Sequence, residues 1–269
     1  MQLMILTNDP EFALEAESAG INRIFIDLEY LNKAERQRGL NTVISNHSLE
    51  DIKVIKSVIT EANLLVRVNP INPMSEKEID TAIDNGADII MLPMAFDAND
   101  ASDFIRFVNG RAKTIVMIET AAALARIDDF IDIKGVDEFF IGLNDLKIDL
   151  GLNFMFEVLS GGLVEYLVNK IHNAGSVVGF GGIAKLGEGE LPAELILSEH
   201  VRLGSQSVIL SRTFKNDPAV SNNEGKINLD LEVFKLRSKY AELKSKSKSD
   251  LDKNKIDIIN IVRKISGRT

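Results

Sequence analysis

The stretch EKEIDTAIDNGADIIMLP, residues 76–93, contains the repeating unit that decides the fold. Its first half has the apolar spacing of an amphipathic helix, and Asn85-Gly86 then ends that helix, because glycine adopts the left-handed conformation of a helix C-terminus at little cost. Its second half, residues 89–93, is a nearly continuous apolar run, which is typical of a strand buried on both faces of a parallel sheet. A helix followed by a buried strand has the content of one β/α repeat, so this stretch predicts a parallel α/β fold.

The same alternation recurs along the chain. Further helical spacing occurs over residues 49–56, 101–108 and 163–171. Strand and helix alternating eight times predict a parallel sheet with right-handed crossovers, and eight units favour a closed (β/α)8 barrel, the TIM barrel, over an open sheet. The eight predicted strands are residues 3–7, 23–27, 64–68, 89–93, 114–119, 138–142, 176–180 and 207–211.

The predicted organisation is a barrel domain over residues 1–227 and a helical extension over residues 228–269. Residues 244–249 read KSKSKS, a polar run that is typical of a linker. The last helix carries an apolar stripe, which must be covered by its own barrel or by a neighbouring subunit. Barrel enzymes often associate through terminal helices, so we expect a homo-oligomer and leave open which surface covers the stripe. The stripe consists of Ile256, Ile258, Ile259, Ile261, Val262 and Ile265.

Composition narrows the class of protein. With 269 residues, 45% of them hydrophobic, the chain is long enough to bury the core of one barrel. It contains no cysteine, which excludes disulfides, zinc–thiolate sites and cysteine nucleophiles. The formal net charge of −9 is opposite to that of a typical nucleic-acid-binding surface, and no apolar run is long enough for a membrane helix. We therefore expect a soluble cytoplasmic protein with neither nucleic-acid nor membrane partners.

Polar side chains at the carboxyl ends of the predicted strands indicate the site, because TIM barrels carry their chemistry there. Glu119 and Asp145 follow two adjacent strands, so we expect their carboxylates to lie close together. Two like charges at short distance need a cation between them or a proton on one of them. Mg²⁺ and Mn²⁺ prefer oxygen ligands, which makes this pair a candidate metal site. The alternative is that one carboxylate caps a helix or pairs with a nearby arginine.

Arg67 lies between Val66 and Val68 in a predicted buried strand, where an arginine rarely lacks an anionic partner. A guanidinium binds a carboxylate through two parallel hydrogen bonds, so the partner can be a substrate carboxylate. It can equally be Asp27 or Glu29 on the neighbouring strand, and the spacing does not choose between these partners.

Further candidates for binding or proton transfer lie at the same end of the barrel. His47, in the loop after the second strand, is the one histidine placed to reach it, although Ser48 beside it has the position of a helix cap. Gly181, within the glycine-rich residues 179–183, and Arg212 after the eighth strand are placed to bind a phosphate through backbone N–H groups and a cation. The glycines can equally serve only to turn the chain.

Short motifs follow the successive predicted strands in a fixed order. They are Ala19-Gly20, Ile26-Asp27-Leu28-Glu29, Val66-Arg67-Val68-Asn69, GADIIMLPM at 86–94, Ile118-Glu119-Thr120, and IGLNDL at 141–146, continuing to Asp149-Leu150-Gly151. Their order and spacing, over about residues 19–214, resemble the HpcH/HpaI aldolase and citrate lyase family of the phosphoenolpyruvate/pyruvate-binding TIM barrels. No motif is decisive alone, but the series is specific.

The resemblance implies a role for each residue. Glu119 and Asp145 would hold a divalent metal, Mg²⁺ or Mn²⁺, and Arg67 would bind the carboxylate of pyruvate or a related 2-oxo acid. The metal would stabilise an enolate, and Asp27 and Glu29 would line the site and help to position water and the groups that surround the metal ligands. The second substrate would be an aldehyde or acyl compound, and the residues expected to be catalytic are Arg67, Tyr30, His47 and Asp27. The residues expected to contact substrate are Arg67, Glu29, Asn69, Pro93, Gly181 and Arg212.

Tyr30 is the position at which this sequence departs from the family it resembles. The aldolase branch carries histidine directly after the strand-two glutamate, where it serves in acid–base chemistry, and the citrate-lyase branch carries aspartate. A tyrosine with an ordinary pKa of about 10 is a poor base at neutral pH. Either Tyr30 donates a proton, or His47 substitutes from the next loop, or the aldol chemistry is lost or altered.

The leading hypothesis is a metal-dependent carbon–carbon lyase or aldolase that acts through the enolate of a 2-oxo acid. The second is a citrate-lyase-like enzyme that acts on an acyl-CoA thioester, and the third is a non-catalytic barrel that binds a 2-oxo acid. The segment after Tyr30 contains Lys33, Arg36 and Arg38, which favours an anionic second substrate.

Overall fold

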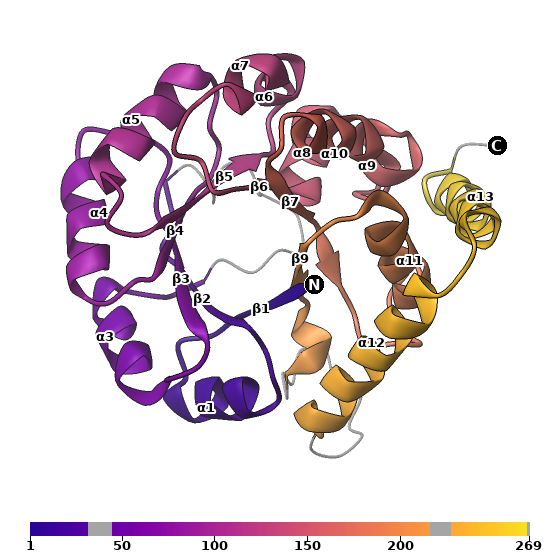
Figure 1. Ribbon diagram of the computed structural model, residues 1–269, viewed down its shortest axis with the longest axis horizontal. Helices are drawn as coiled ribbons and strands as arrows, with labels where there is room; N and C mark the ends of the chain where they lie inside the picture. Colours follow the sequence, from indigo (N-terminus) through magenta and orange to yellow (C-terminus); the bar gives the residue numbers. More distant parts are fainter. Residues whose placement is uncertain (32–44, 216–226, 268–269) are drawn as a thin grey trace.

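The computed structural model describes residues 1–31, 45–215 and 227–267, which form a barrel of parallel strands surrounded by helices (Figure 1). The strands follow one another in the order β7-β6-β5-β4-β3-β2-β1-β9-β8, and all the paired neighbours are parallel. All eight predicted strands are confirmed. Their bounds are β1 Gln2–Leu6, β2 Arg23–Asp27, β3 Asn63–Arg67, β4 Ile89–Leu92, β5 Lys113–Ile118, β6 Glu138–Ile141, β7 Val177–Phe180, β8 Gly182–Ile183 and β9 Ser207–Leu210.

The strand that completes the barrel is interrupted at a glycine. β7 pairs with β6 and β8 pairs with β9, so β7 and β8 are two halves of one strand that is broken at Gly181. Gly181 has a φ of 56°, in the left-handed region that favours glycine, and a Cβ there would lie 2.7 Å from Leu143 Cδ1. With these halves counted together the described strands form the predicted (β/α)8 barrel.

Amphipathic helices cover the outside of the barrel. The four helices predicted from apolar spacing are confirmed as α3, α4, α5 and α10, and Gly204, with a φ of 74°, ends α11 in the left-handed conformation. The described helices up to residue 215 are α1 Pro10–Ser18, α3 Leu49–Val58, α4 Ser75–Asp84, α5 Ala98–Val108, α6 Ala121–Ala125, α7 Ile127–Ile131, α8 Leu143–Asp149, α9 Glu157–Ser160, α10 Leu163–Asn173, α11 Ala193–Leu203 and the 3₁₀ turn η1 Arg212–Phe214.

Apolar side chains fill both sides of the sheet, one layer against the helices and one inside the barrel. A polar cluster joins the strands near their amino ends: Arg23 Nη2 donates to Glu138 Oε2 at 2.7 Å, and Ser207 Oγ donates to Glu138 Oε1. Polar groups at that end of a TIM barrel contribute stability, and chemistry belongs to the opposite end. The inner layer consists of Met4, Phe25, Leu65, Ile89, Met91, Ile115, Met117 and Phe140.

Two helices follow the barrel, α12 Leu229–Lys244 and α13 Lys248–Ile265. The predicted polar linker over residues 244–249 is shorter than expected, because α12 includes its first residue and α13 begins at its fifth. Ser247 caps α13, its Oγ accepting from the N–H of Asp250 at 3.2 Å. A serine at a cap is stabilising, which explains why this low-complexity run supports a helix start.

The last helix packs on its own barrel. α13 contacts α11 and α9, and Ile258 and Val262 are buried there (Figure 1). Ile256, a member of the predicted stripe, is 57% exposed, because two residues along a helix turn a side chain by about 200°. The chain therefore covers part of the stripe itself, and association with a second copy stays a prediction. No helix in the described ranges is long and apolar enough to cross a lipid bilayer.

Candidate active site

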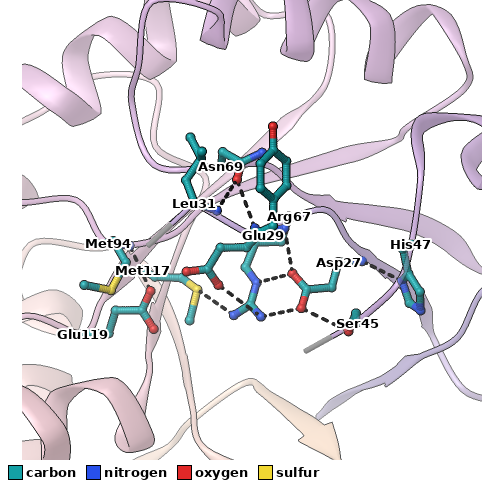
Figure 2. Close-up of polar contacts among 11 residues, drawn as sticks. Asp27, Glu29, Leu31, Ser45, His47, Arg67, Asn69, Met94, Met117 and Glu119 are labelled. Carbon is teal, nitrogen blue, oxygen red and sulfur yellow. Dashed lines mark hydrogen bonds and ion pairs between the residues drawn. The ribbon is translucent and has the colours of Figure 1, made fainter. Parts of the chain in front are cut away.

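Parallel pairing brings the predicted acidic residues and Arg67 to the carboxyl end of the barrel, where Figure 2 shows Asp27, Glu29, Arg67 and Glu119. Asp27 ends β2 and Arg67 ends β3, and the two are register partners. Glu119 directly follows β5, and Asp145 lies in the first turn of α8, just after β6. Residues far apart in the sequence therefore meet at one place.

Asp27 is the protein partner of Arg67. The guanidinium donates through Nε to Asp27 Oδ1 and through Nη2 to Asp27 Oδ2, both at 2.8 Å, and Nη2 lies 3.4 Å from Glu29 Oε2. Burial lowers the pKa of Arg67, but the charges of Asp27, Glu29 and Glu119 more than offset this, so the guanidinium stays charged.

The other edge of Arg67 remains at the cavity. Its Nη1 lies 3.7 Å from Met117 Sδ, and the residue lines the hollow that contains Glu119 (Figure 2). A guanidinium has five N–H donors, and the bonds to Asp27 use two of them. The two predicted partners of Arg67, an acidic neighbour and a substrate carboxylate, are therefore compatible with one geometry.

Asp27 is held by several hydrogen bonds besides those of Arg67. Its Oδ1 accepts from the N–H of Glu29 and its Oδ2 from Ser45 Oγ, each at 3.2 Å, and the side chain is buried. A carboxylate fixed on both oxygens is suited to orient the guanidinium. This geometry is that of a positioning residue, and the catalytic role that the sequence predicts for Asp27 stays a prediction.

His47 and Tyr30 lie on the outer side of this cluster. His47 Nδ1 accepts from the N–H of Asp27 at 3.0 Å, which places the proton of the neutral ring on Nε2 (Figure 2). The Tyr30 side chain is 66% exposed. Both residues line a separate hollow of about 510 Å³ bordered by α3 and α4. The two predicted proton-transfer groups are thus not at the cavity that contains Glu119.

Asn69 ties the loop after β2 to α4. Its Oδ1 accepts from the N–H groups of Tyr30 and Leu31, both at 3.0 Å, and its Nδ2 donates to Glu78 Oε1 at 2.7 Å. The side-chain amide is therefore engaged within the protein, and Asn69 lines the outer hollow with Tyr30. Its contact with substrate stays a prediction.

Glu119 is buried, and its carboxylate is closely surrounded by the backbone of Met94 and Gly142. Its Oε1 accepts from the N–H of Met94 at 2.9 Å, and Met94 has a φ of 51°, a left-handed conformation that is uncommon outside glycine. Gly142 lies beneath the carboxylate, because a Cβ there would overlap Glu119 Oε2. Pro93, a predicted substrate contact, is buried and directly precedes Met94.

The donor set of Glu119 and Asp145 fits a divalent cation. Burial, followed by the charges of Asp145 and Glu29, raises the pKa of Glu119 to about 8. A cation near both carboxylates would offset that cost, and both line the same cavity. Within the described residues no group of three His, Cys, Asp or Glu side chains surrounds one metal position. Water or substrate oxygens would therefore complete the coordination.

The cavity measures about 520 Å³ and brings five of the predicted site residues together. They are Arg67, Glu119, Asp145, Gly181 and Arg212. The N–H of Gly181 donates to Ile141 O at 3.0 Å, so this N–H supports the barrel and is not directed at a phosphate. The basic residues Lys33, Arg36 and Arg38 lie outside the described residues.

Several features of the cavity are absent from the sequence prediction. Glu190 lines it from the loop after β8, and residues 154–156 line it from the segment between α8 and α9. The run Phe154-Met155-Phe156 is too short for a strand and stands apart from the helical spacing, which is the signal that could have identified it. Met94 and Gly142 carry no signal of their own, because their roles depend on where Glu119 lies.

The fold and site define a TIM barrel with a buried carboxylate pair and an arginine at its carboxyl end. Residues 2–184, more than half of the chain, match the family described as HpcH/HpaI aldolase/citrate lyase, and the chain belongs to this family. The resemblance inferred from the strand motifs is thereby confirmed.

Individual relatives agree with this assignment. The chain is 38% identical over 84 residues to a hydroxypyruvate/pyruvate aldolase of Rhizorhabdus wittichii strain RW1, a match that covers 28% of this chain and 34% of that protein. An HpcH/HpaI aldolase from Desulfitobacterium hafniense DCB-2 has a similar structure, with a TM-score of 0.62, 17% identity, and coverage of 78% of this chain and 85% of the other. A family protein from Burkholderia cenocepacia J2315 gives a TM-score of 0.60 at 16% identity, over 91% and 95% of the two chains.

Proposed function

We propose that the protein is a metal-dependent aldolase that forms or cleaves a carbon–carbon bond through the enolate of pyruvate or a related 2-oxo acid. The observation that carries this proposal is the cavity that Glu119, Asp145 and Arg67 share. Family membership supports the reaction class, and the similar segment of a hydroxypyruvate/pyruvate aldolase supports the 2-oxo acid.

Each of these side chains has a distinct task under the proposal. Glu119 and Asp145 would hold Mg²⁺ or Mn²⁺, which when bound would supply Lewis-acid polarisation of the 2-oxo group. Arg67 binds the substrate carboxylate with the donors that Asp27 does not use, and Asp27 fixes the direction of that guanidinium. Binding and orientation are therefore tasks of groups already fixed in the protein.

The reaction requires two proton transfers. In the addition direction a proton leaves C3 of the 2-oxo acid, C3 bonds to the carbonyl carbon of an aldehyde, and the aldehyde oxygen takes up a proton. Cleavage is the reverse, and neither direction needs an oxidant or reductant. A side chain within reach of the cavity must move these protons.

Tyr30 and His47 are the candidates from the sequence, and Glu190 is a candidate from the structure. Neutral His47 carries its proton on Nε2, so in this arrangement it is a donor and not a base. Glu190 is a carboxylate that lines the cavity itself. Its position on the loop after β8 favours it as the group that accepts the C3 proton.

Solvent-deuterium exchange into the methyl group of pyruvate tests the proposal. Exchange should occur with Mg²⁺ or Mn²⁺, stop with EDTA, and be lost in Glu119→Gln. Three variants separate the proton-transfer candidates: Tyr30→Phe, His47→Ala and Glu190→Gln. Glu188→Gln is the matched control for Glu190→Gln, because the Glu188 carboxylate pairs with Lys185 and is not part of the cavity lining. If pyruvate raises the melting temperature but no metal supports exchange, the protein binds a 2-oxo acid without enolising it, and the proposal is wrong.

A further inference from the structure

We infer that the second substrate is an aldehyde with an apolar chain or ring, bound on one side of the cavity; this inference rests on the proposed function. That side, the apolar wall, consists of Phe154, Met155, Phe156, Leu191 and Ile196. It shares a single cavity with Glu119 and Asp145, so a molecule lying on it can reach a carbon activated at the carboxylate pair.

The polar and apolar parts of the cavity come from different parts of the fold. Its charged lining residues Arg67 and Glu119 are at the ends of barrel strands, and Asp145 starts α8. Phe154, Met155 and Phe156 belong to the segment between α8 and α9, whereas Leu191 precedes α11 and Ile196 lies on it. Two segments outside the strands thus supply an apolar surface beside a polar reaction centre.

The apolar wall is fixed before any ligand binds. The Phe154 and Phe156 rings meet edge to face, with centroids 5.4 Å apart and an interplanar angle of 68°. Glu157 Oε1 accepts from the N–H groups of Asn153 and Phe154, both at 2.9 Å, which holds the backbone of the segment. A preformed apolar surface binds an apolar group with little loss of conformational entropy.

The chemistry of the described cavity lining also favours an apolar second substrate over the anionic one that Lys33, Arg36 and Arg38 suggest. The five residues of the apolar wall are uncharged, and a carboxylate placed against them would lose its hydration without gaining a partner. Arg67 is already bonded to Asp27 and is assigned to the 2-oxo acid. Among the described residues Arg212 is the other cation that lines the cavity, so an aldehyde with a carboxylate is the informative competitor.

The test compares aldehydes as partners of pyruvate in the aldol addition with Mg²⁺. We expect kcat/KM to rise about three- to fourfold per methylene from propanal to hexanal, until the apolar wall is covered. Succinic semialdehyde and glyceraldehyde 3-phosphate should react at least tenfold less efficiently than hexanal. A higher kcat/KM for either anionic aldehyde would overturn the inference.

Two matched variants link the preference to the apolar wall. Met155→Gln, which keeps the side-chain length, should lower the ratio of kcat/KM for hexanal to that for glycolaldehyde at least fivefold. Met74→Gln, the same change at an exposed methionine outside the cavity, should leave the ratio unchanged. An unchanged ratio in Met155→Gln would show that the apolar wall does not bind the aldehyde.

The two proposals fail in different ways. Deuterium exchange without a preference for apolar aldehydes overturns this inference alone, whereas absence of exchange overturns the proposed function. In that second case, saturation-transfer NMR with 1-hexanol still examines the apolar wall. A signal from the wild type that Met155→Gln weakens supports an apolar site, and equal signals contradict it.

Discussion

The residues of the candidate site form a buried cluster with an excess of negative charge. The carboxylates of Asp27, Glu29 and Glu119 lie near a single guanidinium, that of Arg67, and the carboxylate of Asp145 lies near Glu119. Asp27 and Arg67 neutralise one another at 2.8 Å, and burial, followed by the charges of Asp145 and Glu29, raises the pKa of Glu119. A site that is electrostatically costly without a cation is expected to gain stability when it binds one.

Glu119→Gln should raise the melting temperature of the metal-free protein and at the same time weaken its binding of Mg²⁺. The neutral amide removes a buried charge, so the metal-free variant should melt at a higher temperature than the wild type at pH 8, by roughly 2 to 4 °C for each kcal/mol gained. Mg²⁺ should raise the melting temperature of the wild type and not that of the variant. Asp103→Asn, at an exposed position, is the control. If the variant melts at a lower temperature than the wild type at pH 8, the buried charge of Glu119 does not destabilise the metal-free protein and the prediction is wrong.

Gly142→Ala should weaken metal binding because a Cβ at this position displaces the Glu119 carboxylate. We expect a loss of affinity of about 10- to 100-fold, comparable to that caused by disturbing groups that orient metal ligands. Gly182→Ala is the matched control, since its Cβ would meet only Ile209 O at an ordinary 3.5 Å. Calorimetric titration with Mn²⁺ measures both, and equal affinities would show that Glu119 is not a ligand.

At the scale of elements, α13 supports the helices that adjoin the apolar wall of the cavity. It contacts α9 and α11, and Glu157, the first residue of α9, holds the segment that forms the apolar wall. Lys255 of α13 lies 2.7 Å from Glu165 of α10, which also binds Arg202 of α11. The terminal helix is therefore tied to the barrel by both packing and charge.

Ile258→Ala and Ile256→Ala test this packing as a matched pair. Ile258 is buried against the barrel, so its truncation should cost about 2–5 kcal/mol in the free energy of unfolding. Ile256 is exposed, and its truncation should change that free energy by less than about 0.5 kcal/mol. Urea unfolding gives both values. A large loss in Ile256→Ala would indicate that a second copy of the chain covers this face.

At the scale of the whole molecule, a buried histidine on α11 is expected to make stability depend on pH. His200 is fully buried on α11, its ring is stacked on Phe180 with centroids 3.8 Å apart, and Nδ1 lies 3.0 Å from Ser205 Oγ. Burial, and then the charge of the N-terminus, lower the pKa of His200 to about 3. The folded chain therefore holds His200 neutral across the physiological range.

Stability should fall as the pH drops below about 6.5. The folded pKa of His200 lies below its unfolded value, so the unfolded chain binds the proton first, and the stabilisation present above pH 6.5 is lost on acidification towards the folded pKa. Between pH 7 and pH 5 this amounts to about 2 kcal/mol. His200→Gln should reduce this pH dependence, measured by urea unfolding at the two pH values. Equal dependence in both proteins would mean that His200 titrates normally.

The sequence by itself determined the barrel, the order of its strands and the family. These features rest on local patterns: apolar runs such as residues 89–93 become strands because both faces are buried, and Gly86 and Gly204 end helices because they adopt positive φ. The strand-end motifs could be located for the same reason, since a residue that ends a strand of a TIM barrel must lie at its mouth.

The tertiary structure decided which groups meet. The spacing left the partner of Arg67 open, and it is the register of β2 against β3 that sets Asp27 opposite it. Tyr30 and His47 follow the correct strand but line an outer hollow, and the apolar wall comes from segments with no strand signal. Distances between elements depend on packing over the whole barrel, and no local pattern encodes them.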